Sequence, residues 1–313
     1  MLRCMCFSAM VVEEYRAYKR ATGATIDIYQ FAEIFGYEPP RSKLTIPRFV
    51  ERWFDNPGSP AEQGIHDLIA KRRAAQAAQW QQELFAQKKR LADAERKLAV
   101  KDTKAAAESR RIAADKIEKL VKRLNRLEDP EPHASDGRIF PMNYAPIVIS
   151  EDGRKVIKLA RYHCRLAGKP ASVDFQFPGL YNARRDNIEK YWGGAFGMSH
   201  ALMLVESFYE NVERDGRNAV LHFTPRPADI MLIACLYSKW KDAKTGEELL
   251  SFAAITDEPP AEVSAAGHDR MIINIKPENV DAWLTPAGRS REELQAILSD
   301  MQAPYYEHEL LAA

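Results

Sequence analysis

A cysteine that directly follows an internal methionine is the most reactive arrangement in this sequence. Cys6 follows Met5 in "MLRCMCFSAM". Because an initiator methionine before a small residue is usually trimmed, a chain begun at Met5 would carry Cys6 with a free α-amine beside its thiol. Such an amine has a pKa of about 8 and is partly neutral at neutral pH. An amine and a thiol on adjacent carbons condense with an aldehyde to a five-membered thiazolidine. We expect translation from Met5, or removal of a leader, to expose this group.

The motif "GHDRM" holds His268, Asp269 and Arg270 after an expected strand and a polar loop. There it would place an imidazole for proton transfer and a guanidinium for a phosphate. Most such triplets are plain loops in which the aspartate forms a turn and the arginine is solvated. Cys6 has an equally plain alternative, because most lone cysteines are inert small hydrophobic residues. Neither motif identifies a site by itself.

Two further motifs, "ESFYEN" and "LYNARRDN", carry carboxylates, an amide and arginines. Alternation along a strand puts Glu206, Phe208 and Glu210 on one face, although a strand carboxylate lies more often at a solvated rim than in a site. Asn182 precedes two arginines, of which the first is Arg184, in a polar loop that is otherwise a surface turn. These residues are candidates for proton transfer and for contacts with an anion.

Taken in order, "MC", "NYAP", "YNAR", "SFYE" and "GHDRM" resemble the SOS-response-associated peptidase (SRAP) family, the abasic-site processing proteins. The resemblance covers roughly residues 5–15 and 139–285, and the last motif is its most specific part. It implies an α+β fold with a mostly antiparallel, strand-rich, barrel-like core. It also implies an enzyme of the DNA-damage (SOS) response, which traps the ring-opened aldehyde of an abasic site in single-stranded DNA as a covalent thiazolidine crosslink.

Carried over residue by residue, the resemblance assigns a role to each candidate. Cys6 would be the nucleophile, its amine forming a Schiff base and its sulfur closing the ring. Asn182 would hold the N-terminal residue in position, and Glu210 would act as general acid and base. His268 would assist proton transfer and stabilise the Schiff base. The two arginines that the resemblance assigns to the DNA backbone are Arg184 and Arg270. This chemistry requires no metal and no other cofactor.

Two other functions stay open at this point. A cysteine peptidase would use Cys6 as nucleophile, His268 as base and Asn182 to orient the imidazole, and it would remove the residues before Cys6 itself. A non-catalytic nucleic-acid-binding or scaffold protein would act through a helical arm instead. An aldehyde trap needs an exposed amine, a peptidase needs only the thiol and the base, and a scaffold needs neither.

A long helical segment is expected between Gly64 and Pro130, because it lacks glycine and proline and is rich in strong helix formers. About 60 residues would extend about 90 Å as one helix. A fold-back near "VKDTK" would halve that length and give a helical hairpin or a weak coiled coil. The apolar residues that recur every seventh position are Leu84, Leu91, Leu98, Ala105 and Ile112.

The same segment concentrates the positive charge of the chain. Residues 66–127 hold 17 Lys and Arg against 8 Asp and Glu, a net charge of +9, whereas the whole chain carries only +1. The remaining residues therefore carry −8, which is a poor surface for DNA outside an arginine-lined cleft. We expect the helical segment either to add affinity for DNA, to bind a partner or another copy of itself, or to be a solvated spacer.

Short runs rich in β-branched and aromatic residues follow this helical segment in the sequence. Most are joined by turns too short for crossover helices, so they should pair antiparallel. The runs are "APIVIS", "KVIKLARY", "SVDFQF", "HALMLVESFYE", "NAVLHFT", "DIMLIACLY" and "LLSFAAIT". Helices return with "PENVDAWL" and "SREELQAILSDM". The sequence thus predicts a catalytic domain formed by residues 5–60 and 130–313, interrupted by a helical basic insertion over residues 61–129.

Composition sets outer limits on the class of protein. With 46% hydrophobic residues the chain has ample material for a core. Its four cysteines include no CxxC pair, so neither a disulfide framework nor a zinc site is expected. No eighteen apolar residues run together, and no export signal is evident. We expect a cytoplasmic protein with no membrane partner, associated with the nucleoid when bound to DNA.

Overall fold

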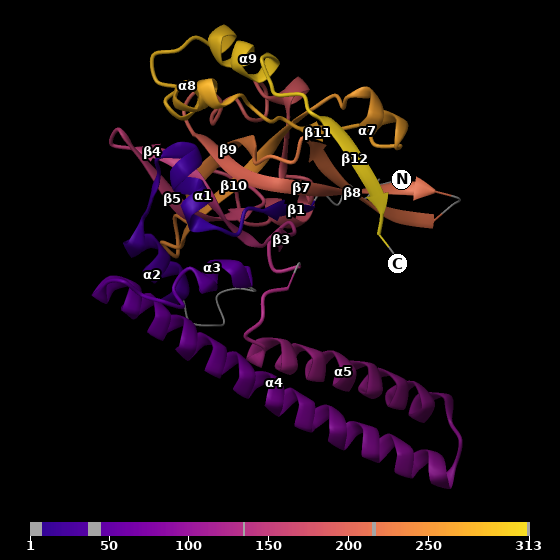
Figure 1. Ribbon diagram of the computed structural model, residues 1–313. Coiled ribbons are helices and arrows are strands. Elements are labelled where there is room, and N and C mark those ends of the chain that lie inside the picture. Colours follow the sequence, from indigo (N-terminus) through magenta and orange to yellow (C-terminus); the bar gives the residue numbers. More distant parts are fainter. Residues whose placement is uncertain (1–7, 37–44, 134, 215–216, 312–313) are drawn as a thin grey trace. The chain divides into compact units, whose positions relative to one another are not determined.

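The computed structural model describes residues 8–36, 45–133, 135–214 and 217–311 (Figure 1). The chain divides into two compact units. Residues 1–56 and 134–313 form the strand-rich unit, and residues 57–133 form the hairpin unit. No helix in the described ranges is both long and apolar enough to cross a membrane.

Five strands of the strand-rich unit close into a barrel. They are β4 (Tyr144–Glu151), β5 (Arg154–Tyr162), β7 (His200–Arg214), β9 (Met231–Lys241) and β10 (Glu248–Asp257). Around the barrel β10 pairs with β5, β5 with β4, β4 with β7, β7 with β9, and β9 with β10. Only the contact between β5 and β10 is parallel. The expectation of an α+β fold with a mostly antiparallel, barrel-like core is confirmed.

Shorter strands extend this barrel. The second half of β7 pairs with β1 and β8, and β10 carries β6 and β11 along its edge. β3 pairs with β1, β12 with β8, and β2 with β5. Their bounds are β1 (Ser8–Val11), β2 (Thr25–Ile26), β3 (Arg138–Ile139), β6 (Asn182–Arg184), β8 (Arg217–Arg226), β11 (Met271–Ile272) and β12 (Tyr305–Leu310).

The segment that holds the N-terminal helices carries a cluster of aromatic side chains. The N-terminal helices are α1 (Tyr15–Thr22), α2 (Ile28–Gly36) and α3 (Arg48–Arg52). The ring of Trp53 lies 5.6 to 6.1 Å from four other rings of this segment, those of Tyr15, Tyr18, Phe31 and Phe49. Offset and edge-on ring contacts of this kind stabilise a core beyond the area they bury.

One of the C-terminal helices anchors to β7. These helices are α7 (Ala261–Ala265), α8 (Val280–Leu284) and α9 (Arg291–Ser299), with 3₁₀ turns at Arg185–Asn187 and Pro277–Asn279. Trp283 of α8 is fully buried, and its indole N–H donates to the carbonyl of Ala201 at 2.9 Å. His200 contacts the same helix, and burial lowers its pKa to about 3. His200 is therefore a neutral core histidine.

One expected strand is wrong. "SVDFQF" forms the short helix α6 (Val173–Gln176). Its alternating apolar residues do not share a buried face, because Phe175 and Phe177 are 88% and 54% exposed while Asp174 is buried. Ion pairs between Asp174 and two buried arginines hold this segment, so tertiary contacts override the strand pattern.

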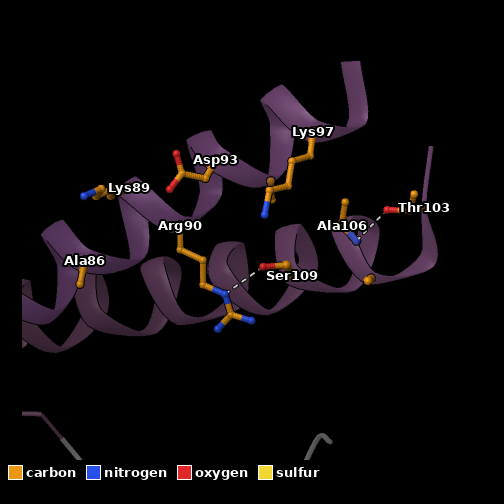
Figure 2. Close-up of a pocket in the computed structure, with 10 residues that line it drawn as sticks. Ala86, Lys89, Arg90, Asp93, Lys97, Thr103, Ala106 and Ser109 are labelled. Atoms are coloured by element: carbon orange, nitrogen blue, oxygen red, sulfur yellow. Dashed lines mark hydrogen bonds between the residues drawn. The ribbon is translucent and has the colours of Figure 1, made fainter. Parts of the chain in front are cut away.

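The hairpin unit consists of two long helices, α4 (Pro60–Val100) and α5 (Lys104–Glu128), as expected from the fold-back near "VKDTK". The side chains of Ser59 and Thr103 cap the helices by accepting from backbone N–H groups three residues later, both at 3.3 Å. Near the turn, a groove of about 510 Å³ lies between the helices (Figure 2). Its polar lining includes Lys89, Arg90, Lys97 and Ser109.

The expected seam is half-buried at Leu84, Leu91 and Leu98 of α4 and at Ile112 of α5, but it is not the most buried face of α5. Ala105 is exposed, whereas its neighbour Ala106 is buried, and the buried series continues at Ala113 and Leu120. The three non-helical residues 101–103 separate the helices, and α5 restarts one residue out of phase with the seventh-residue repeat. On α5 the most buried residues therefore lie one position after those of the expected repeat.

Leu120→Ala tests this packing. Leu120 is 3% exposed and its neighbour Val121 is 38% exposed. Removing a buried leucine side chain costs about 2 kcal/mol or more, so L120A should lower the temperature at which helical signal is lost in far-UV circular dichroism. Val121→Ala is the matched control and should leave that temperature unchanged or slightly higher, because alanine favours helix. Equal shifts for both variants would contradict the assigned seam.

Candidate functional site

A carboxylate and an imidazole meet in the interior of the strand-rich unit. Nε2 of His268 lies 2.9 Å from Oε2 of Glu210, and the two residues are only 7% and 3% exposed. Nδ1 of His268 lies 2.7 Å from the carbonyl oxygen of Arg270. This shorter contact requires a hydrogen on Nδ1, because a carbonyl only accepts hydrogen bonds, although the N–H of Arg270 also lies 3.3 Å from Nδ1. Nε2 is then the nitrogen that can exchange a proton with Oε2 of Glu210.

Burial and mutual interaction set the pKa values of this pair. Burial raises the pKa of Glu210 to about 7, against the opposing hydrogen bond and charge of His268. Burial lowers the pKa of His268, but the hydrogen bond with Glu210 and its charge outweigh burial, so that this pKa is raised. A carboxyl group with a pKa near neutrality is suited to give and take protons at physiological pH.

The loop between β10 and β11 carries His268 into place. After α7 the N–H of Gly267 donates to the carbonyl of Ser264 at 2.9 Å. Gly267 has φ of +98°, a conformation that costs energy for any residue with a Cβ. The chain then returns as β11, where Met271 pairs with Asp257 of β10. A helix on one side and a strand on the other thus fix the position of the imidazole.

A bulge in β7 separates Glu210 from Glu206. Consecutive residues of β1 pair with Val205 and then with Ser207, so Glu206 is an extra residue in the ladder. Glu206 is exposed and Glu210 is buried. The expectation that strand alternation puts both carboxylates on one face is therefore wrong, because the bulge shifts the alternation between them.

Asn182 lies on β6, in register with Ala254 of β10. Its Oδ1 is buried and accepts no hydrogen bond from the residues that the structure describes. A buried amide oxygen without a donor is costly, so this atom is suited to receive an N–H from a further group. Neither ring nitrogen of His268 contacts Asn182 within the described ranges, since one faces Arg270 and the other faces Glu210.

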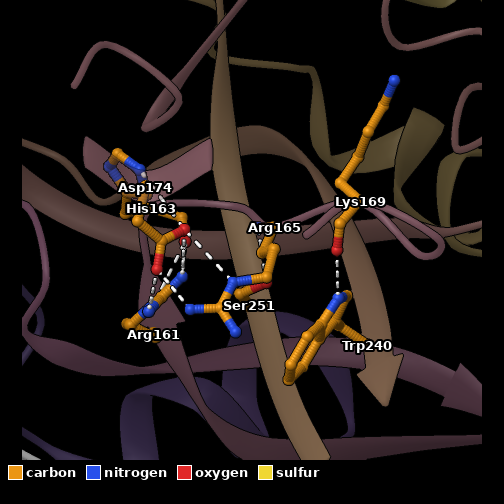
Figure 3. Close-up of polar contacts among 7 residues, drawn as sticks. All are labelled: Arg161, His163, Arg165, Lys169, Asp174, Trp240 and Ser251. Atoms are coloured by element: carbon orange, nitrogen blue, oxygen red, sulfur yellow. Dashed lines mark hydrogen bonds and ion pairs between the residues drawn. The ribbon is translucent and has the colours of Figure 1, made fainter. Parts of the chain in front are cut away.

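A buried ion-pair cluster fixes the segment that leads to Asn182 (Figure 3). Asp174 of α6 accepts from Arg161 at 2.8 and 3.1 Å and is also ion-paired with Arg165. The guanidinium of Arg165 lies over the ring of Trp240 at 4.2 Å. Burial, followed by the charge of Arg161, lowers the pKa of His163 beside this cluster to about 4. The cluster thus holds the segment before β6, and no pattern in the sequence marked it.

Arg184 and Arg270 converge on one carboxylate. Oδ2 of Asp186 lies 2.7 Å from Arg184 and 3.1 Å from Arg270. Hydrogen bonds from Arg184 and then Arg270 lower the pKa of Asp186 to about 2, so that it stays ionised. Sequence reasoning named both arginines but missed Asp186, whose only signal is its position in "NARRD". The arrangement shows that both guanidiniums can face one anionic group.

The two described cysteines are unsuited to nucleophilic chemistry. Cys164 and Cys235 are fully buried, and burial raises the pKa of both thiols, that of Cys164 to about 12. The reactive form is the thiolate. Cys6 lies outside the described residues. Ser8, where β1 begins, pairs with Tyr209, which directly precedes Glu210. The strand that follows Cys6 therefore pairs with the strand that carries Glu210.

No group of three or more His, Cys, Asp or Glu side chains within the described ranges could hold a metal ion. The sequence matches a family model described as SOS response associated peptidase (SRAP) over residues 105–311, about two thirds of the chain. The chain belongs to the SRAP family. The match starts within α5 and runs to the end of β12, so it includes both Glu210 and His268. These two residues are called the SRAP pair below.

Individual relatives are more distant. The abasic site processing protein YobE of Bacillus subtilis (strain 168) is 28% identical over 132 residues, which are 40% of this chain and 59% of YobE. The SRAP chain thus spans about three fifths of the length of that relative. Similar crystal structures include a protein from Bacteroides thetaiotaomicron, with a TM-score of 0.48 at 18% identity over 56% of this chain and 77% of that chain. Another, from Bordetella bronchiseptica, has a TM-score of 0.46 at 17% identity over 59% and 90%.

Glu210→Gln tests the electrostatics of the SRAP pair. With the carboxylate removed, the burial that lowers the pKa of His268 is no longer opposed, so this pKa should fall below its ordinary value of about 6.5. The measurement is an NMR titration of the histidine ring signals, assigned with His268→Gln. Glu206→Gln, on the same strand but exposed, is the control and should leave the titration of His268 unchanged. A His268 pKa that stays raised in E210Q would contradict the pairing.

Proposed function

We propose that this SRAP protein processes abasic sites in single-stranded DNA by forming a covalent thiazolidine crosslink through Cys6, once Cys6 is the N-terminal residue. The observation that carries the proposal is the buried pair of Glu210 and His268, whose Oε2 and Nε2 atoms lie 2.9 Å apart. Glu210 lies on the strand that pairs with β1, and β1 begins two residues after Cys6. The name of YobE, an abasic site processing protein, agrees with this chemistry.

The reaction joins an aminothiol to an aldehyde with loss of water. The α-amine nitrogen of Cys6 attacks C1′ of the ring-opened sugar, and its proton moves to the former aldehyde oxygen. That oxygen leaves as water when a second proton reaches it, and a Schiff base forms. The thiol then adds to the imine carbon while its proton moves to nitrogen, which closes the thiazolidine. Each step moves a proton over a short distance, which is the task of a general acid and base.

Glu210 is the group suited to these transfers. Its pKa of about 7 leaves a useful fraction protonated at neutral pH, and His268 can return the proton through Nε2. The amine must be neutral to attack, and an ordinary α-amine has a pKa of about 8. The rate should therefore fall above about pH 8, where Glu210 lacks its proton, and at acid pH, where the amine is charged. The open acceptor on Asn182 is suited to an N–H of the N-terminal residue.

Single-stranded DNA is the substrate form that the surroundings favour. Arg184 and Arg270 already share an anionic group, Asp186, and could exchange it for a phosphate. The segment before Asn182 carries two exposed aromatic rings, Phe175 and Phe177. Exposed rings stack on unpaired bases, and such stacking is a usual feature of proteins that bind single strands.

A self-cleaving cysteine peptidase is the alternative, and the geometry favours it less. In that mechanism His268 must take the proton of a thiol while Asn182 orients its ring. In the described structure Glu210 and the Arg270 carbonyl occupy the two ring nitrogens. The imidazole is thus oriented by groups other than Asn182.

The crosslink is tested by intact mass of the protein before and after incubation with single-stranded DNA that carries one abasic site. We expect a mass that begins at Cys6 and an adduct that survives denaturation. Cys6→Ala should abolish the adduct. E210Q should slow its formation about 10²-fold, since general acid–base catalysis contributes at least that much.

Two controls make this result specific. Cys6→Ser keeps the amine but cannot close the ring, so it should give an adduct only when borohydride reduces the Schiff base. Glu206→Gln removes an exposed carboxylate from the same strand and should crosslink at the normal rate. A protein that retains Met1 to Met5 and forms no adduct would refute the proposal. Loss of those five residues that is blocked in C6A, without any adduct, would favour the peptidase.

The hairpin unit is proposed to add affinity for the DNA backbone. Lys89, Arg90 and Lys97 line the groove near its turn (Figure 2). Arg90 donates to the hydroxyl of Ser109 at 3.0 Å. None of these three cations is ion-paired with a carboxylate among the residues that the structure describes, so their charges remain available to phosphates.

A pair of double variants with equal loss of charge tests the hairpin. Lys89→Ala with Lys97→Ala should weaken binding of undamaged single-stranded DNA and reduce the slope of log affinity against log salt by about 1.4, or about 0.7 for each phosphate contact. Lys122→Ala with Arg111→Ala is the control, because Lys122 is paired with Glu118 and Arg111 with Glu108. Identical affinities and slopes for both double variants would show that the hairpin does not bind DNA through this groove.

A further inference from the structure

Arg138 of β3 is a half-buried arginine without a carboxylate partner. Its Nε donates to the hydroxyl of Ser8 at 3.0 Å. Its guanidinium lies 3.7 Å from the centre of the Tyr209 ring and 5.0 Å from that of Phe140. Among the described residues no carboxylate is ion-paired with it, and its two terminal nitrogens donate to no acceptor. A charge that is partly withdrawn from water and not neutralised is unusual, because burial penalises it.

Six other arginines of the strand-rich unit differ in this respect. Each has a carboxylate within 3.1 Å, so its charge is compensated inside the protein. These ion pairs are Arg52 with Asp136, Arg161 and Arg165 with Asp174, Arg184 and Arg270 with Asp186, and Arg185 with Asp257. Arg138 alone in this comparison presents an uncompensated guanidinium.

Stacked rings hold the guanidinium in one orientation. The ring of Tyr209 lies against Arg138 on one side and stacks on the ring of His222 on the other, at 4.4 Å between centres and 11° between planes. His222 is itself fixed, since Nε2 lies 2.8 Å from the hydroxyl of Ser207 and Nδ1 lies 3.0 Å from Glu309. A planar cation on an aromatic face keeps its N–H groups at the edge, where they remain free to donate.

The position of Arg138 relates it to the reaction centre. Ser8, which accepts from Arg138, comes two residues after Cys6 and pairs with Tyr209. Glu210 follows Tyr209 on β7 and faces the other side of the sheet, because successive residues of a strand alternate. Arg138 therefore contacts β1 and β7, the two strands on which the proposed chemistry takes place. Arg184 and Arg270 belong to other segments, β6 and the loop before β11.

We infer that Arg138 binds a phosphate of the single-stranded DNA backbone next to the nucleotide that reacts with Cys6. This inference rests on the proposed function and deepens it by naming a positioning residue. A guanidinium offers two parallel N–H groups that match two phosphate oxygens, and the terminal nitrogens of Arg138 are the free ones. A bound phosphate would neutralise a half-buried guanidinium that has no carboxylate partner among the described residues, and it would fix the strand relative to β1.

Binding of an undamaged single-stranded oligonucleotide across a range of salt concentrations tests this inference. All proteins carry Cys6→Ala, so that no crosslink forms. Arg138→Gln should raise Kd about tenfold and reduce the slope of log affinity against log salt by about 0.7, the value for one lost phosphate contact. Arg138→Lys should keep the slope and lose part of the affinity, because it keeps the charge but not the two-pronged geometry.

Arg20→Gln is the control for loss of charge, since Arg20 is exposed and paired with Glu14 at 3.0 Å. A Kd and slope for R138Q equal to those of R20Q would overturn the inference. Near-UV circular dichroism checks that Tyr209 keeps its packing. If R138Q does not fold, the affinity of R138K for the oligonucleotide is the test. An unchanged affinity of a folded R138K would overturn the bidentate contact.

Crosslinking in the Cys6 protein separates this inference from the proposed function. If Arg138 positions DNA, R138Q should crosslink more slowly at low DNA concentration and at a near-normal rate when DNA saturates. A wild-type protein that crosslinks while R138Q behaves as R20Q would refute the inference alone. A wild-type protein that never crosslinks, with DNA binding still weakened in R138Q, would refute the proposed function and leave Arg138 as a DNA contact.

Discussion

The burial of Glu210 against His268 is the interaction on which the arrangement of the strand-rich unit depends. A carboxyl group that is only 3% exposed needs a partner that can accept or supply its proton. That partner arrives on a different part of the sheet, through the loop that leaves β10 and returns as β11. Because β7 and β10 both pair with β9 in the barrel, closure of the barrel brings the two partners together.

The bulge at Glu206 divides β7 into two parts that pair with different strands. Before it, β7 closes the barrel with β4 and β9, and after it the strand pairs with β1 and β8. The register places Phe208 on the face of Val205, since their β1 partners are two residues apart. In a regular strand Tyr209 would share that face and Glu210 would turn away from it. One extra residue therefore sends the carboxylate inward and leaves the Tyr209 ring under Arg138.

The sequence predicted the features that local pattern determines and missed those that distant contacts determine. Helix formers without glycine or proline defined the hairpin, and short apolar runs defined most strands. α6 was mistaken for a strand because Asp174 is held by arginines from another segment, and the α5 seam was shifted because Thr103 restarts the helix. Motif order named Glu210 and His268, but no pattern in the sequence gave their contact. Arg138 belongs to no motif, so only the rings around it distinguish it.

Three polar features would be poor choices if stability alone shaped this protein. The buried Glu210–His268 pair, the open acceptor of Asn182 and the uncompensated charge of Arg138 each cost more than an apolar replacement of similar size. Glu210 lies on β7 and Asn182 on β6. Arg138 lies on β3, which pairs with β1. A single group would satisfy them together if it offered an N–H to Asn182, protons to exchange with the pair and a phosphate to Arg138. The N-terminal cysteine joined to a DNA strand that the proposed function requires would offer all three.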